Sequence, residues 1–345
     1  MFLQSIASAF PEFTYSQEDC WNTIKESPLS ALLKPRSLTI LEKILTGDSG
    51  IEERHFCLEK PEEVFLKNAG QLNQEFEKFA PLISGNALQK ALKQADLPAS
   101  EIDALFICTC TGYICPGITS HLAEQLGMRS DVYLQDLVGL GCGAAIPTLR
   151  SADGYLKANP NATVAVIAVE ICSAAFYMDN DPGVLISLCL FGDGASASIW
   201  RSRPSEVGPP HRLQNFQTVH KPEDREKIRF VNAEGKLKNK LDRSVPHLAA
   251  ETVGELFQTA GHNGDIDQIL AHPGGRDVIE AIEGNLSHFQ LKESRHILQN
   301  YGNLSSPSVL VALEHHLASE DPKDRLWLTS FGAGFACHSA DFVCS

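Results

Sequence analysis

Cys142 is the strongest candidate for a catalytic nucleophile in this sequence. It lies in the stretch VGLGCGAAIPTLR, directly after a run of residues typical of a buried strand. Glycines on both sides allow a sharp turn, and the small residues that follow suit a tightly packed helix. A thiol at a helix N-terminus lies at the positive end of the helix dipole, which favours the thiolate. The alternative is that Cys142 is a small apolar residue in a glycine-rich helix start.

Two further turns carry side chains that could assist such a nucleophile. His272 lies in ILAHPGGRDVIEAIE, where a buried strand ends at a chain reversal, so its ring could project into a cleft. Asn303 lies in NYGNLSSPSVLVALE, beside Gly302, Ser305 and Ser306, a cluster typical of a helix start. Each has a structural alternative: a histidine bonded to a carbonyl group, and an asparagine that caps a helix.

The elements that would position these residues follow from the hydrophobic pattern. Apolar runs bounded by turn residues predict strands buried on both faces, and helical periodicity fills the segments between them. The predicted strands are Asp103–Thr109, Val132–Leu137, Ala162–Ile171, Ala195–Trp200, Ile266–Ala271, Arg325–Ser330 and Gly334–Val343. The predicted helices are Asn86–Ala95, Ile118–Leu126, Pro246–Ala260, Arg276–Phe289 and Ser306–Leu317.

The order of these elements repeats along the chain. Residues 84–200 and 246–343 each begin with a helix and a strand, continue with further helices and end on a pair of strands. The polar, proline-containing segment Arg201–Val245 is expected to connect them. We therefore predict an α/β protein with two fused halves, residues 1–205 and 206–345. In that arrangement the helix that starts at Cys142 is equivalent to the one that starts near Asn303, and a pseudo-twofold axis would bring the two residues together.

A cysteine, a histidine and an asparagine gathered in this way suit acyl transfer. A thiolate can attack a thioester, while the histidine and asparagine donate hydrogen bonds to the oxyanion or enolate that develops. Preorganised donors of this kind contribute about 3 kcal/mol each to the transition state.

The sequence resembles the type III polyketide synthases, the chalcone synthase-like group of thiolase-fold enzymes. The matching stretches are GCGAAIPTLR at Cys142, LFGDGASA at 190–197, AHPGGRDVIE at His272, YGNLSSPSVL at Asn303 and SFGAGF at 330–335, with ICTCTGYICPG nearer the N-terminus. The resemblance implies a thiolase-like fold in which two duplicated halves form a five-layered α-β-α-β-α core. It also implies decarboxylative Claisen condensation of an acyl-CoA starter with malonyl-CoA, and cyclisation to a pyrone, a resorcinol or a related product.

The resemblance also implies roles for individual residues. Cys142 would carry the starter and the growing chain, and His272 and Asn303 would promote decarboxylation of malonyl-CoA. Phe191 matches the gatekeeper phenylalanine between the CoA tunnel and the reaction cavity. The other residues expected to bind substrate on the cavity wall are Cys110, Thr111, Cys172, Ala174, Ala175 and Ser305.

Two departures from the family pattern bear on the substrate. Only Lys43 is basic within LEKILTGD, where plant members direct basic residues at the CoA phosphates, so the CoA-binding residues stay unassigned. Asn239 lies where a second gatekeeper aromatic is expected. Together with the small wall residues, Asn239 predicts a roomy cavity that favours medium or long fatty acyl-CoAs over cinnamoyl-type starters.

The composition argues against several other classes of protein. A net charge of −14 without any basic run argues against nucleic-acid binding. Neither a signal peptide nor a membrane span is evident, so a cytoplasmic protein is expected. Ten scattered cysteines without a CxxC pair predict reduced, buried thiols rather than disulfides or a zinc site. No metal is expected, and no cofactor apart from coenzyme A thioesters as substrates.

The resemblance further implies a homodimer. The loop Gly112–Gly117 matches the one that sends a residue into the neighbour's cavity, and Cys115 would be that residue. The sequence allows two other functions. One is a single condensation of the ketoacyl synthase III type that uses acyl carrier protein. The other is a non-enzymatic thiolase-fold subunit, which the complete set of Cys142, His272 and Asn303 argues against.

Overall fold

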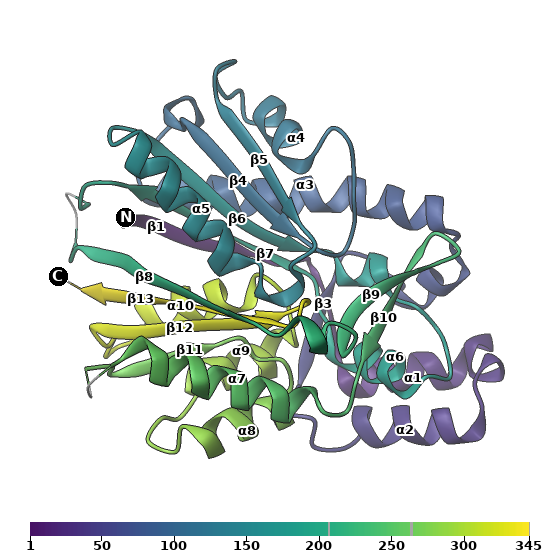
Figure 1. The fold of residues 1–345 in the computed structure, drawn as a ribbon. Helices are drawn as coiled ribbons and strands as arrows, with labels where there is room; N and C mark the ends of the chain where they lie inside the picture. Colours follow the sequence, from purple (N-terminus) through teal and green to yellow (C-terminus); the bar gives the residue numbers. More distant parts are fainter. Residues whose placement is uncertain (206–207, 263–264, 345) are drawn as a thin grey trace.

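The computed structural model describes residues 1–205, 208–262 and 265–344. Its largest feature is a nine-stranded mixed sheet with the order β11-β12-β13-β8-β1-β7-β6-β4-β5 (Figure 1). Two short ribbons, β2 with β3 and β9 with β10, hold the remaining strands of the described residues. The strands are β1 (Phe2–Ala9), β2 (Phe13–Ser16), β3 (Glu53–Phe56), β4 (Ala104–Thr109), β5 (Tyr133–Val138), β6 (Thr163–Glu170), β7 (Gly194–Arg201), β8 (His211–His220), β9 (Ile228–Ala233), β10 (Lys236–Leu241), β11 (Gln268–Ala271), β12 (Arg325–Gly332) and β13 (Ala336–Cys344). The helices are α1 (Gln17–Glu26), α2 (Pro35–Leu45), α3 (Ala69–Gln94), α4 (Ile118–Gln125), α5 (Ala145–Ala158), α6 (Pro182–Leu190), α7 (Val245–Ala260), α8 (Arg276–Asn285), α9 (Lys292–Tyr301) and α10 (Ser308–Leu317).

The strands form two sets with the same order. In the first half, β5, β4 and β6 run parallel, β7 is antiparallel to β6, and β1 lies beyond β7. In the second half, β11 and β12 run parallel, β13 is antiparallel to β12, and β8 lies beyond β13. The two sets meet where β1 pairs with β8 through Phe2 and Arg212. The predicted repeat of element order is therefore confirmed, and within the described residues the second half lacks a counterpart of β5.

Three apolar clusters separate five layers of structure. In the middle, α5 and α10 pack between the two sets of strands through residues such as Ala145, Leu149, Val309 and Leu313. On the outer side of the first half, α3 and α4 cover the strands through Ala87, Leu88 and Leu122. On the outer side of the second half, α7 and α8 do the same through Val253, Ile279 and Ile282. The arrangement is the expected α-β-α-β-α core (Figure 1).

The continuous apolar runs mark the most buried strands. Every residue of β4 and of β6 is buried, because helices cover both faces of these parallel strands. Each of the seven predicted strands is present, with ends that differ by at most two residues. The predicted helix Arg276–Phe289 ends earlier, at Asn285, and α9 follows it as a separate helix that the sequence pattern did not predict.

The interpretation of Arg201–Val245 as a polar connector is wrong in part. This segment contains β8, the first strand of the second half, and the hairpin of β9 and β10. These strands were missed because they are only partly buried and carry many polar side chains. The predicted division between residues 205 and 206 falls beside residues 206–207 and so lies outside the described residues. None of the helices in the described ranges has the length and apolar character needed to cross a bilayer.

Candidate active site

The turn that carries Cys142 follows β5, as predicted. Gly139 and Gly141 have φ values of 89° and 59°, a left-handed conformation that glycine adopts without strain. A short 3-10 turn spans Gly141–Gly143, and α5 begins at Ala145 rather than at Cys142. A Cβ atom on Gly332 would lie 2.5 Å from the backbone nitrogen of Gly143, so only glycine allows β12 to approach this turn.

His272 follows directly after β11. Its backbone nitrogen donates to the Thr329 carbonyl oxygen at 2.9 Å, which extends the pairing of β11 with β12 by one residue. Its side chain is fully buried, and the ring meets the Phe331 ring edge-on at 5.1 Å between centroids. The Nδ1 atom is buried without a hydrogen-bond partner among the described residues. Hence the alternative of a histidine whose Nδ1 is bonded to a carbonyl group is not observed.

Asn303 does not cap a helix. The helix α10 begins five residues later, at Ser308, after Pro307 at the cap position. The backbone of Asn303 instead pairs beside Phe191, with its nitrogen 2.8 Å from the Leu190 oxygen. Its Nδ2 donates to the Gly274 carbonyl oxygen at 3.2 Å, and its Oδ1 accepts from the Ser305 backbone nitrogen at 2.8 Å. The side chain therefore reaches toward the turn that contains His272.

A chain of short contacts joins the three residues predicted to be catalytic. The Ser305 hydroxyl donates to Cys142 Sγ at 3.2 Å, and the Ser305 backbone donates to Asn303. Asn303 donates to the Gly274 carbonyl, and the Gly274 nitrogen donates to the His272 carbonyl oxygen at 3.0 Å. Residues separated by more than a hundred positions in the sequence thus share one site, built from both halves of the fold.

Burial controls the ionisation of the thiol and the imidazole. Burial raises the pKa of Cys142 to about 12, although the hydrogen bond from Ser305 opposes the shift. Burial lowers the pKa of His272 to about 3. Both groups are therefore uncharged at neutral pH in the free site, and the expected thiolate is not the resting form, because desolvation opposes an isolated charge. A neutral imidazole is able to accept the thiol proton when the nucleophile reacts.

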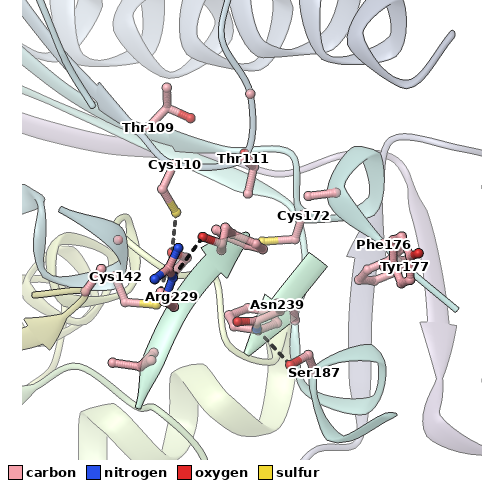
Figure 2. A pocket seen from close by; sticks show the side chains of 18 of the residues that line it. Thr109, Cys110, Thr111, Cys142, Cys172, Phe176, Tyr177, Ser187, Arg229 and Asn239 are labelled. Carbon is pink, nitrogen blue, oxygen red and sulfur yellow. Dashed lines mark hydrogen bonds between the residues drawn. The ribbon is translucent and has the colours of Figure 1, made fainter. Parts of the chain in front are cut away.

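Cys142 opens into a cavity of about 280 Å³ beneath α6 and the hairpin of β9 and β10. Cys110, Cys172 and Cys142 lie one, two and four residues after the ends of β4, β6 and β5, so the segments that leave three neighbouring strands supply one wall (Figure 2). Of the residues predicted to bind substrate, those found on the wall are Phe191, Cys110, Thr111, Cys172, Ala175 and Ser305. Ala174 is not among the lining residues; it packs in the outer core of the first half, on the other side of its short 3-10 turn.

Glu170 is a buried residue of the site whose role the sequence did not indicate. Its Oε2 accepts hydrogen bonds from Thr109, Cys110 and Thr111 at 2.9–3.1 Å, and its Oε1 accepts from Ser306 Oγ at 2.5 Å. Burial raises the pKa of this carboxyl group. The carboxyl group fixes the end of β4 to the segment that follows Asn303. In the sequence, the only sign of this role was that Glu170 is the single acidic residue at the end of the apolar run VAVIAVE.

Two family models match the chain. A model described as FAE1/type III polyketide synthase-like protein matches residues 11–261, and the chalcone and stilbene synthase C-terminal domain matches residues 213–337. The first of these matches covers well over half of the chain. The chain belongs to the type III polyketide synthase family.

Individual relatives agree with this assignment. The chain is 29% identical over 351 residues to 1,3,6,8-tetrahydroxynaphthalene synthase of Streptomyces peucetius, with 98% of this chain and 91% of the relative covered. It is 30% identical to 3,5-dihydroxyphenylacetyl-CoA synthase of Amycolatopsis orientalis over 77% of this chain and 74% of the relative. The structure of 1,3,6,8-tetrahydroxynaphthalene synthase from Streptomyces coelicolor superposes with a TM-score of 0.86 at 25% identity, with 100% of this chain and 99% of the other covered. PKS-I of the brown alga Ectocarpus siliculosus shares the fold, with a TM-score of 0.90 at 22% identity and coverage of 99% and 98%.

The family assignment makes this type III polyketide synthase an acyltransferase with the thiolase fold. The region around Lys43 differs from the plant pattern. Lys43 is exposed on α2, and Asp48 beyond it contacts Arg276 at the start of α8. Arg276 also lies near Asp277 and Glu280. This arginine is therefore surrounded by carboxylates, and no CoA-binding residue is assigned from this region.

No metal-binding group is evident in the parts of the chain that the structure describes. Among these residues, no set of three His, Cys, Asp or Glu side chains is arranged to hold a metal ion. All ten cysteines are free.

Proposed function

We propose that this enzyme condenses an acyl-CoA starter with malonyl-CoA through Cys142 and releases a cyclised polyketide. The sulfur of Cys142 attacks the starter thioester, the CoA thiol leaves, and the acyl group stays on the enzyme. Malonyl-CoA then loses carbon dioxide, and the carbon of the resulting enolate attacks the acyl carbonyl. One carbon–carbon bond forms, and the bond to Cys142 breaks. The observation that carries the proposal is the placement of Cys142 on the cavity wall, joined through Ser305 and Asn303 to the His272 turn.

In this proposal His272 and Asn303 stabilise the enolate. Bonds to the Gly274 oxygen and the Ser305 nitrogen hold the Asn303 amide, and burial against the Phe331 ring holds the imidazole of His272. Such held donors stabilise developing negative charge without a further cost of reorganisation. His272 also accepts the proton of Cys142 during loading, because the imidazole is neutral in its buried position.

For the starter, we propose a medium or long aliphatic acyl-CoA. The lining of the cavity combines small side chains, Cys172 and Ala175, with the aliphatic Val184 and Leu188. Each methylene group buried against such a wall contributes about 0.8 kcal/mol, which favours a flexible alkyl chain. The cyclised product would then be an alkylpyrone or an alkylresorcinol. The names of two relatives describe aromatic products, so a starter assay must also include malonyl-CoA alone.

The assay that tests this function uses a panel of acyl-CoAs from acetyl to palmitoyl, 4-coumaroyl-CoA and a reaction without any starter, each with labelled malonyl-CoA. Mass spectrometry identifies the products. Cyclised products with two or more malonyl-derived units support the proposal. Diketides formed only with malonyl-acyl carrier protein would indicate the ketoacyl synthase III reaction instead. A higher kcat/KM for 4-coumaroyl-CoA than for decanoyl-CoA would contradict the proposed starter.

We also propose that the enzyme is a homodimer that works in the cytoplasm. The edge strand β5 exposes three apolar side chains, Tyr133, Leu134 and Val138, and Tyr113 in the nearby loop is 70% exposed. An exposed edge strand with apolar residues favours pairing with another strand. Cys115, in the same loop as Tyr113, is exposed and so could reach a neighbouring subunit. The free state of all ten cysteines fits a reducing compartment.

A further inference from the structure

The hairpin of β9 and β10 contains an aromatic side chain opposite Asn239. In this antiparallel pair, Asn239 lies directly across from Phe230. Residues opposite each other in such a pair point to the same face, with their Cβ atoms about 5 Å apart. Both residues line the cavity that holds Cys142. An aromatic ring is therefore present on this wall although residue 239 is an asparagine.

Asn239 is engaged in fastening the hairpin to α6. Its Nδ2 donates to Ser187 Oγ at 2.7 Å, and Ser187 Oγ donates in turn to the Gly183 carbonyl oxygen at 2.7 Å (Figure 2). Asn239 is 9% exposed, so its amide group is held rather than free to move across the cavity. Phe191 caps the C-terminus of the same helix, and its backbone nitrogen donates to the Ser187 oxygen at 3.2 Å. The position of the hairpin is thereby tied to that of Phe191.

Other contacts hold the hairpin along its whole length. At its base, a Cβ atom on Gly183 would lie 2.5 Å from the Leu241 oxygen, so α6 approaches β10 at backbone distance. In the middle, Lys238 pairs with Asp179 and its Nζ lies 5.6 Å from the centre of the Tyr177 ring. At the tip, a Cβ atom on Gly235 would lie 2.9 Å from Ala69. Phe230 therefore lies on an anchored hairpin and not on a free loop.

We infer that Phe230, rather than residue 239, is the aromatic side chain that sets the length of acyl chain the cavity accepts, and that Asn239 positions the hairpin. The inference rests on the proposed function, because it assigns Phe230 to the acyl-binding part of that site. It also gives the cavity an aromatic wall residue beside the small residues Cys172 and Ala175, because Phe230 on β9 lines the cavity together with Asn239 on β10.

The test replaces Phe230 by alanine and measures kcat/KM for octanoyl-CoA and dodecanoyl-CoA. Removal of the ring makes room for about two more methylene groups. The ratio of kcat/KM for dodecanoyl-CoA to that for octanoyl-CoA should therefore rise about tenfold. The matched control is Val231→Ala, since Val231 lies next in β9, pairs with Lys238 and does not line the cavity. Its ratio should equal that of the wild type. Asn239→Leu, which removes the donor to Ser187, should lower the melting temperature.

If the alanine variant does not fold, Phe230→Leu is measured in its place. Its ratio of kcat/KM for dodecanoyl-CoA to that for octanoyl-CoA should rise about threefold. A ratio within twofold of wild type in a folded Phe230 variant would overturn the inference, as would an equal rise in Val231→Ala. If the proposed function is wrong, the wild-type enzyme forms no malonyl-dependent product with any starter. In that case the chain-length dependence of acyl loading on the protein, followed by intact mass, still decides the role of Phe230.

Discussion

Cys142 and Asn303 occupy equivalent places in the two halves, each in a turn that leads into a helix of the central layer. The two turns differ in detail. The Cys142 turn passes into α5 within three residues, whereas α10 begins five residues after Asn303. In the first half the side chain faces the cavity, and in the second it reaches the Gly274 carbonyl beside His272. The repeated strand order brings the two side chains to the same place. The conformation of each turn then determines which groups its side chain can reach.

The largest expected effect belongs to the turn of the first half. Cys142→Ala should reduce polyketide formation by at least about 10³-fold, because in the proposed mechanism Cys142 carries the acyl intermediate. Product formation under saturating substrate measures the loss. The matched control is Cys110→Ala, since the Cys110 sulfur lies 3.5 Å from the same Ser305 hydroxyl and is expected to matter far less. If the two variants lost activity equally, the distinction between these thiols would be wrong.

The second prediction separates decarboxylation of malonyl-CoA from acyl loading on Cys142. Asn303→Ala should lower decarboxylation of malonyl-CoA by about 10²- to 10³-fold while acyl loading on Cys142 persists, because the proposal makes the amide a donor to the enolate. Release of labelled carbon dioxide and intact mass report the two steps. His272→Ala should impair both steps, since the imidazole also accepts the thiol proton. Asn300→Ala on α9 serves as the control, and unchanged decarboxylation in Asn303→Ala would leave that residue a purely structural role.

The halves also differ at the outer edges of the sheet. On β11, the Ser294 side chain of α9 donates to the Ala271 oxygen at 2.6 Å and accepts from the Ala271 nitrogen, so the chain itself covers this edge. On β5, alternate residues are exposed and the edge is open within the chain. The difference supports the proposal that β5 pairs with a second copy of the chain.

A charge on the open edge should therefore separate the subunits. Leu134→Lys on β5 should yield a monomer of about 37.7 kDa by light scattering, where the wild type gives twice that mass. The control Leu66→Lys changes another strongly exposed leucine, outside this edge, and should leave the dimer intact. Wild-type protein that is monomeric at micromolar concentration would contradict the proposed pairing.

The smallest expected effect concerns two adjacent alanines in different environments. Ala175→Phe should fill the cavity and shorten the preferred starter, with a loss of about tenfold in kcat/KM for decanoyl-CoA relative to hexanoyl-CoA. Ala174→Phe should instead overpack the outer core and lower stability by about 1–3 kcal/mol without a change in preference. Kinetics with two starters and thermal melting distinguish the two outcomes. If Ala175→Phe left the chain-length preference unchanged, Ala175 would not lie where the starter binds.

The sequence was most informative where burial was complete. The uninterrupted apolar runs of β4 and β6 predicted strands covered on both faces, and the glycine-flanked turns located Cys142 and His272. The partly polar strands β8, β9 and β10 carried no such signal, so the wall formed by Phe230 was not foreseen. The cap interpretation of Asn303 was wrong because its amide is bonded across the chain to Gly274. Contacts between distant segments of this kind have no local pattern in the sequence.

The most direct test of the account is covalent capture of the starter on Cys142. The protein is incubated with decanoyl-CoA in the absence of malonyl-CoA, and intact mass and peptide mapping follow. The account predicts one decanoyl adduct per chain, located on the peptide that contains Cys142, and no adduct on folded Cys142→Ala. An adduct of equal yield on that variant, or one that maps to Cys110 or Cys172, would contradict it.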